Sequence, residues 1–276
     1  MLSRVLLASC AFSASCLAAI VPYNFRIRNV NAAPDGFQRS VVSVNGLIPG
    51  TLITARKGDT LSINVTNELT DSSMRRATTI HWHGLFQTGT ASEDGPAFVT
   101  QCPISQFNSY TYQIPLDQQT GTFWYEFSET SPRDETDNPG HIRYHSHLSS
   151  QYVDGLRGAL VIYDPQDPQR NLYDVDDATT IVTLEDWYHL PAPTLQAQFL
   201  STNNTALAAP VPDSALINGR GRYIGGPTVP RAVINVTKGK RYRLRVINMS
   251  SIGSYTFSIE GHSLTIIVSV TTMIST

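Results

Sequence analysis

The chain has 276 residues, enough for about two domains, and 41% of them are hydrophobic, as in a folded globular protein and unlike an intrinsically disordered one. Charged residues make up 15% and the formal net charge is −2, so nothing favours a nucleic acid or an anionic membrane surface as a partner. Beyond the first twenty or so residues, no segment is long and apolar enough to span a bilayer.

The first residues have the pattern of a cleaved secretory signal. Arg4 precedes an apolar run that ends in small residues at Cys16-Leu17-Ala18-Ala19. This pattern predicts cleavage after Ala18 or Ala19, with residues 1–18 as the signal peptide. A membrane anchor is the alternative, but the apolar run is short for a transmembrane span. We therefore expect a secreted, extracellular protein.

Four Asn-x-Ser/Thr sequons agree with secretion, because this tripeptide is the acceptor for N-linked glycans. The candidate glycosylation sites are Asn64, Asn203, Asn235 and Asn248.

Short runs rich in Val, Ile, Thr and Tyr alternate with turn residues, and no long stretch has helical periodicity. The runs predict strands at 40–44, 60–65, 109–114, 159–163, 180–184 and 241–247. Many short strands at this spacing are typical of all-β sandwich domains. A Pro- and Asp-rich segment, residues 164–168, is interpreted as a linker between two domains.

Two His-x-His motifs carry the clearest chemical signal, His81-Trp82-His83 and His145-Ser146-His147. On a strand, residues i and i+2 point to the same face, so each motif presents two imidazoles side by side and directs Trp82 or Ser146 the other way. Imidazole is a ligand for zinc and copper, and copper(II) binds more tightly at a given site. Hydrogen-bonded surface histidines without a metal are the alternative.

Longer strings around these motifs resemble fungal laccases, which are multicopper oxidases. The similar strings include His81–Gly84, 94–104, 121–125, 144–148 and 186–189. The resemblance implies cupredoxin-like Greek-key β-sandwich domains, namely a first domain at 19–163 and an incomplete second at 164–276, with the family's third domain absent. It also implies a monomer that oxidises phenols or aromatic amines at four coppers and reduces dioxygen to water.

The same resemblance implies roles for individual residues. His81 would bind the type 2 copper, while His83, His145 and His147 would bind the type 3 pair. Asp94 matches an acidic position that assists proton delivery, as oxygen reduction requires. Without the resemblance, Asp94 could equally be a turn residue before Gly95. His189 and His262 do not match ligand positions and are interpreted as structural.

The chain also departs from the laccase pattern. It contains no His-Cys-His motif and supplies four of the eight histidines of the trinuclear cluster. Cys102 matches a cysteine that the family joins to a distant C-terminal partner. We therefore expect this chain to be inactive by itself. Two alternatives are a non-catalytic secreted copper-binding protein or mis-spliced product, and another multicopper oxidase such as a ferroxidase.

Residues 125–143 interrupt a string that laccases read without a break, Phe-Trp-Tyr-His-Ser-His. This interval is charged, lacks strand alternation and is interpreted as an exposed loop or disorder. The residues at its two ends can be encoded by codons that resemble a fungal splice donor and a splice acceptor. The first residues of the tail 268–276 can likewise be encoded by codons that resemble a donor. We hypothesise two translated introns. A natural loop insertion, which costs little entropy, is the alternative.

Overall fold

The computed structural model describes residues 18–121 and 142–267. Within these two stretches the strands form three four-stranded sheets, in the orders β2-β1-β4-β6, β3-β8-β7-β5 and β11-β10-β9-β12. The strands are β1 (Ile20–Ala32), β2 (Arg39–Val44), β3 (Ile53–Arg56), β4 (Thr60–Asn67), β5 (Ile80–His83), β6 (Ser109–Pro115), β7 (Ile142–Ser146), β8 (Arg157–Tyr163), β9 (Ile181–Trp187), β10 (Ser214–Ile217), β11 (Arg220–Gly221) and β12 (Arg245–Asn248). The predicted all-β architecture is confirmed.

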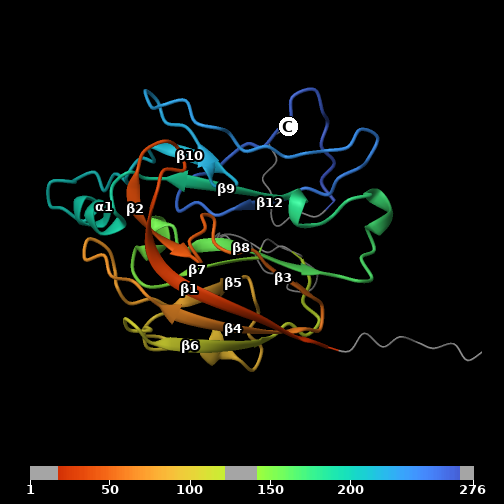
Figure 1. Cartoon of the computed structure of the whole chain (residues 1–276), viewed down its shortest axis with the longest axis horizontal. Coiled ribbons are helices and arrows are strands. Elements are labelled where there is room, and N and C mark those ends of the chain that lie inside the picture. The colour runs from red at the N-terminus through yellow and green to blue at the C-terminus, as the bar shows by residue number, and fades with distance from the viewer. Residues whose placement is uncertain (1–17, 122–141, 268–276) are drawn as a thin grey trace, which may run out of the picture.

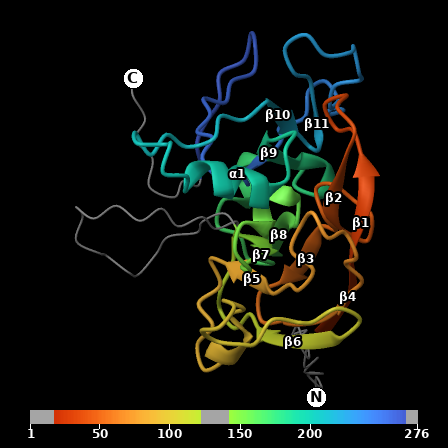
Figure 2. The same ribbon diagram turned by 90° about the vertical axis from the view of Figure 1, so that its left-hand side faces the viewer.

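The three sheets are stacked as layers, with β6 and β4 at one end of the stack and β9 and β10 at the other (Figures 1 and 2). The first two sheets enclose the largest core, which includes Phe25, Ile63, Trp82, Tyr112 and Tyr144. Strand β4 alternates buried and half-buried side chains, so one face fills this core and the other faces outward. The alternation of apolar and polar residues along such strands thus provides the apolar faces that pack together in the sandwich.

Strand β8 lies in the middle layer and is buried on both faces. Leu160 and Ile162 belong to the first core, whereas Ala159 and Val161 pack against Ile247 in a second core. A strand covered on both sides needs apolar residues at nearly every position, which explains the unbroken apolar run of β8. The strand carrying one His-x-His motif is therefore braced by a neighbour that the third sheet covers.

The predicted strands agree with the observed ones, apart from the last. The strand expected at 241–247 is shorter, Arg245–Asn248. Arg241 instead uses its carbonyl to accept the N–H groups of Asp174 and Val175. The pattern also missed a short helix, α1 (Ala192–Phe199), which begins directly after Pro191. Proline favours a helix start, but eight residues give too weak a periodicity to detect.

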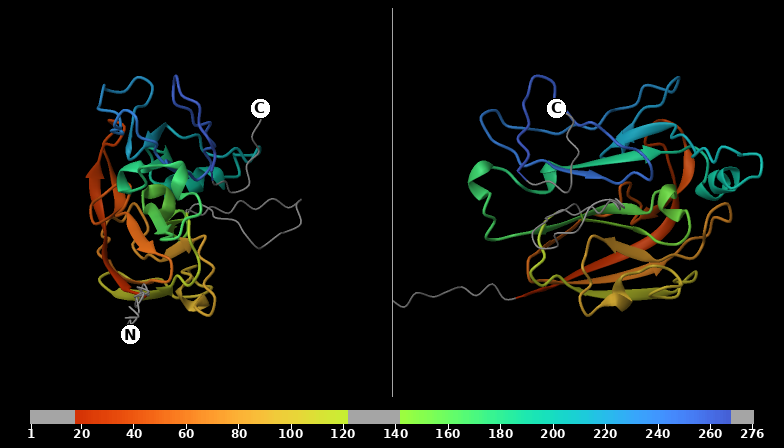
Figure 3. Two further views of the ribbon diagram at one scale, coloured as in Figure 1. Left: turned by 90° about the vertical axis from the view of Figure 1, so that its right-hand side faces the viewer. Right: turned by 180° about the vertical axis from the view of Figure 1, so that it is seen from behind.

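The segments between β11 and β12, and those after β12, lie on the side of the third sheet away from the other two (Figure 3). No helix among the residues described has the length and apolarity needed to cross a membrane. The domain boundary at 164–168 stays a prediction. Of the interval 125–143, positions up to 141 lie outside the described residues, as do the signal peptide through residue 17 and the tail 268–276.

The start of β1 is tied to the turn before β4. The backbone N–H of Ala19 donates to Asp59 Oδ1 at 3.1 Å, and Thr60 N–H donates to the Ala19 carbonyl at 2.8 Å. Asp59 is 8% exposed, and its other oxygen accepts the N–H of Arg56 at 2.8 Å. The chain is thus held in place one residue before β1 begins.

Candidate metal centre

The two His-x-His motifs lie on neighbouring antiparallel strands. In the β5–β7 register His81 is paired with His145, and Trp82 with Tyr144. Trp82 is fully buried in the main core and Ser146 is 2% exposed, so both point away from the histidine face as predicted. One face of the middle sheet therefore carries His81, His83 and His145. His147 follows the end of β7 and is exposed.

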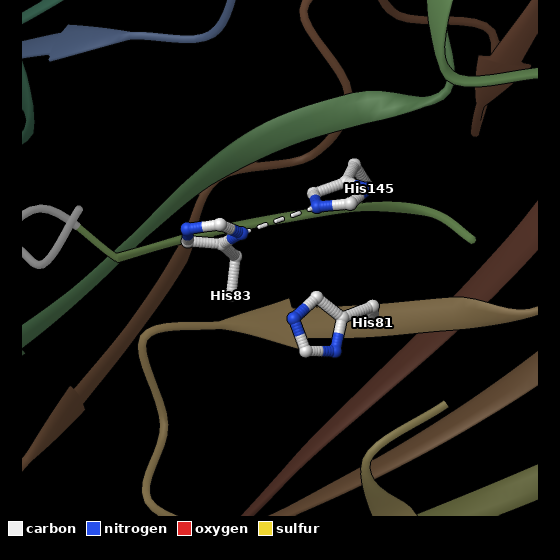
Figure 4. A group of neighbouring side chains, drawn as sticks. All are labelled: His81, His83 and His145. Atoms are coloured by element: carbon white, nitrogen blue, oxygen red, sulfur yellow. Dashed lines mark hydrogen bonds between the residues drawn. The ribbon is translucent and has the colours of Figure 1, made fainter. Parts of the chain in front are cut away.

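Three imidazoles converge closely enough for one metal site. His81, His83 and His145 each offer a nitrogen, and these atoms lie within 4.8 Å of one another (Figure 4). His145 Nε2 is 3.5 Å from His83 Nδ1. Two nitrogens about 2.0–2.1 Å from a shared ion, at angles between tetrahedral and trigonal, are separated by about 3.3–3.6 Å. The donor set and its spacing fit a copper or zinc ion.

Backbone carbonyls fix the tautomers of two of these rings. His81 Nδ1 lies 2.7 Å from the Asp94 carbonyl and His145 Nδ1 lies 2.9 Å from the Ser146 carbonyl. A carbonyl can only accept, so each Nδ1 carries the proton and each Nε2 keeps its lone pair. This is the arrangement that orients histidines toward a metal.

The residue predicted for proton delivery lies beside the cluster. Asp94 Oδ1 is 3.3 Å from His81 Nδ1, and the Asp94 side chain is 28% exposed. The preceding Glu93 accepts hydrogen bonds from Tyr110 Oη at 3.1 Å and Gln113 N at 3.2 Å, which anchors this loop to β6. Asp94 thus touches both solvent and a cluster imidazole.

Gly95 allows this loop to approach so closely. Its φ is +92°, and a Cβ there would lie 1.8 Å from the Ile80 carbonyl oxygen. A side chain at this position would force the loop away from β5, and Asp94 with it.

A buried glutamine that sequence reasoning gave no role holds the two motifs together. Gln151 is fully buried, and its Oε1 accepts Thr78 Oγ1 at 2.8 Å and Ser146 Oγ at 2.7 Å. Its Nε2 donates to the carbonyls of Arg75 and Ala77 at 2.9 and 3.0 Å. The run into β5 and the end of β7 are therefore joined through one saturated amide.

Two buried arginines share the histidine face, and sequence reasoning gave them no role either. Arg143 is opposite His83 on β7, and Arg157 is opposite His145 on β8. The pKa of His145 is held well below its ordinary value, mainly by burial and further by the charges of Arg143 and His81. His145 is thus neutral near pH 7 and keeps its lone pair for a ligand.

A tyrosine links the cluster to the segment that directly follows β12. The ring of Tyr152 lies edge-on to His145, 4.9 Å between centroids, and its hydroxyl donates to the carbonyls of Met249 and Ser250. The latter contact is 2.8 Å. Tyr152 thus packs against His145 while its hydroxyl is hydrogen-bonded to the residues that follow β12.

The other histidines with predicted structural roles lie elsewhere. His189 Nε2 lies 2.8 Å from Asp35 Oδ2, and its ring stacks on Phe37 at 3.9 Å. His262 is exposed, with Nδ1 2.9 Å from the Glu260 carbonyl. Among the residues described, Cys102 is a free, exposed thiol.

The four sequons differ in their surroundings. Asn203 and Asn235 are exposed. Asn64 lies on the outer side of β4 and donates to Thr111 Oγ1 at 2.9 Å. Asn248 is half-buried, with its amide donating to the Gly253 carbonyl at 2.9 Å. Their glycosylation stays a prediction.

The family models described as multicopper oxidase match residues 26–137 and 178–272, which together take in most of the chain. Laccase-4 of Thanatephorus cucumeris is 69% identical over 257 residues, and Laccase-2 of Agaricus bisporus is 49% identical over 261 residues. These alignments cover 93% and 95% of this chain but 45% of each relative. The chain thus spans about half the length of the curated relatives it matches.

Solved structures agree on the fold. A laccase from Botrytis aclada superposes with a TM-score of 0.63 at 31% identity, covering 84% of this chain and 38% of that one. Fet3p, a multicopper oxidase that functions in iron import, superposes with a TM-score of 0.60 at 32% identity, covering 73% and 33%. The predicted cupredoxin-like sandwich architecture is confirmed.

Proposed function

Since the chain belongs to the multicopper oxidases, of laccase type, we propose that His81, His83, His145 and His147 supply half of a trinuclear copper centre. The observation that carries this proposal is the 3.5 Å separation of His83 Nδ1 and His145 Nε2, with His81 beside them. In the proposed assignment His81 is the type 2 ligand, and the other three serve the type 3 pair. The remaining ligands would come from the part of a laccase to which this chain has no counterpart.

Copper bound at such a centre supplies one-electron chemistry, by which dioxygen is reduced to water at the expense of phenols or aromatic amines. The chain's own residues orient the histidine ligands and determine which ring nitrogens carry protons. The carbonyls of Asp94 and Ser146 keep Nε2 of His81 and His145 unprotonated. The Asp94 carboxylate lies between solvent and His81, so it is placed to pass protons inward during oxygen reduction.

The protein is proposed to be exported. The leader at residues 1–18 and the four sequons support this reading, and the curated relatives it matches include laccases of three fungal species. The laccase activity, its phenolic substrates and a monomeric state are proposals for the complete protein.

Copper binding tests the proposal directly. The 276-residue polypeptide should bind copper(II) and show electron paramagnetic resonance coupling to imidazole nitrogens. Replacing His81 and His83 by Ala should remove that signal, and the exposed His262→Ala variant should retain it. Unchanged copper stoichiometry in the double variant would place the site elsewhere.

Activity is expected to require more than this chain. The sequence contains no His-Cys-His motif, so its copper-loaded form should show no intense blue absorption and no phenol-dependent oxygen uptake. Either signal would contradict the proposed division of the centre. For the complete protein, kinetics with a phenol against iron(II) would distinguish a laccase from a ferroxidase.

A further inference from the structure

Arg143 stands out because it is a buried cation next to a site for cations. It is 8% exposed and directly opposite His83, so strand geometry puts both side chains on the same face of the sheet. Directly opposite residues on paired strands have Cβ atoms about 4.5–5.5 Å apart. The guanidinium therefore belongs to the immediate surroundings of the histidine cluster.

No carboxylate among the described residues forms a direct ion pair with Arg143, and Asp186 acts on it only from beyond ion-pair distance. Arg143 Nη1 donates to the Asn248 carbonyl at 2.6 Å, its Nε has no hydrogen-bond partner, and the guanidinium lies 5.8 Å from the Tyr152 ring centroid. These are neutral groups. A buried charge that has no direct ion pair among these residues keeps much of its field on its neighbours.

Arg157 is a second buried arginine on the same face, but its charge is balanced by carboxyl groups. It is fully buried opposite His145, but Glu185 and Asp186 lie 3.2 and 3.1 Å away. Its charge is balanced by carboxyl groups in direct contact with it. Arg143 is the arginine of this pair whose field reaches a bound ion.

We propose that Arg143 sets the charge selectivity of the histidine cluster, weakening copper(II) more than copper(I). This inference rests on the proposed copper site. Coulomb repulsion scales with the charge of the ion, so the penalty for copper(II) is twice that for copper(I) in free energy. A binding constant lowered about tenfold for the monovalent ion would be lowered about a hundredfold for the divalent ion.

Affinities of the 276-residue chain for each ion test this. Copper(I) would be measured anaerobically by competition with a chromogenic chelator, and copper(II) by competition with an amino-acid chelator. Arg143→Leu removes the charge and introduces no copper ligand, Arg143→Lys keeps the charge, and Arg143→Gln is a second neutral variant. Arg26→Leu removes a charge at an exposed site, where the side chain is 62% exposed.

Arg143→Leu and Arg143→Gln should bind copper(I) about tenfold and copper(II) about a hundredfold more tightly, while Arg143→Lys and Arg26→Leu stay within about twofold of the parent. An equal gain for both ions would mean that packing, not charge, is responsible, and no gain would also overturn the inference. If His81→Ala/His83→Ala leaves copper binding intact, the proposed site itself fails. Circular dichroism and melting curves establish that each variant is folded.

Discussion

The two His-x-His motifs have the same spacing and lie opposite each other, yet their surroundings differ in charge. His81, on β5, contacts a carboxylate, with Asp94 Oδ1 at 3.3 Å. His145, on β7, is acted on by the charge of the buried Arg143, while Arg157 opposite it is paired with Glu185 and Asp186. Identical motifs therefore give ligands of unequal strength, since the groups behind an imidazole tune its donor capacity. The β5 motif is expected to be the stronger half.

Deleting each motif separately gives the largest effect and tests this ranking. His81→Ala/His83→Ala should weaken copper(II) binding by about a hundredfold or more, because it removes two ligands, one of which contacts the Asp94 carboxylate. His145→Ala/His147→Ala should weaken it less, since His147 is exposed and Arg143 opposes a cation at His145. Isothermal titration of both variants measures the difference. A greater loss in the second variant would reverse the ranking.

Displacing the carboxylate through the backbone is expected to have an effect of similar size, on stability. Gly95→Ala should lower the free energy of unfolding by more than about 3 kcal/mol, through backbone strain and the contact with the Ile80 carbonyl. Gly89 is a matched control: its φ is +75°, but a Cβ added there would meet no atom within 4 Å. Gly89→Ala should cost about 1 kcal/mol. Equal losses in urea titrations would show that the Ile80 contact is unimportant.

Removing the amide that joins the motifs should have a somewhat smaller effect on stability. Gln151→Met keeps the volume but leaves the hydroxyls of Thr78 and Ser146 and two carbonyls without their partner. We expect a loss of about 2–3 kcal/mol in unfolding free energy. The exposed Gln166→Met variant should be neutral. A neutral Gln151→Met would mean that water replaces the amide.

Neutralising the carboxylate alone should have the smallest effect. Asp94→Asn keeps the backbone carbonyl that holds His81, so copper(II) affinity should fall only about threefold to tenfold. In the complete enzyme, oxygen reduction should slow more than copper binding weakens, if Asp94 passes protons. An oxidase rate that tracks copper occupancy alone would remove that role.

Local pattern was enough to predict six of the described strands and the shared face of each motif, but it missed β1, the longest of them. Period-2 alternation depends on neighbouring residues and is present in β4 and β6, whereas β2 and β8 were recognisable as short runs rich in Val or Ile. The position of Asp94 came from family resemblance. Gln151 and Arg143 could not be recognised, because their surroundings depend on contacts such as Gln151 with Arg75, 76 positions away. Helix α1 was missed because it is short and polar.

Whether residues 125–143 are a translated intron also matters for Arg143, because Arg143 is part of that interval. Excising residues 125–143 would place Trp124 directly before Tyr144, so a neutral indole would occupy the position of Arg143. The transcript decides between intron and loop. We expect spliced cDNA to lack the codons for 125–143; a mature transcript that retains them would refute the intron hypothesis. In the first case the charge selectivity proposed here is a property of the unspliced product alone.

The contact between Ala19 and Asp59 has a consequence for maturation. Cleavage after Ala18 would convert the Ala19 amide into an α-ammonium group at the position that now donates to Asp59. Export would then create an ion pair with a nearly buried carboxylate, and signal removal would complete the fold rather than merely trim it. The secreted protein should begin at Ala19 and melt higher than its Nα-acetylated form. A mature protein that begins at Ile20 would lack this ion pair.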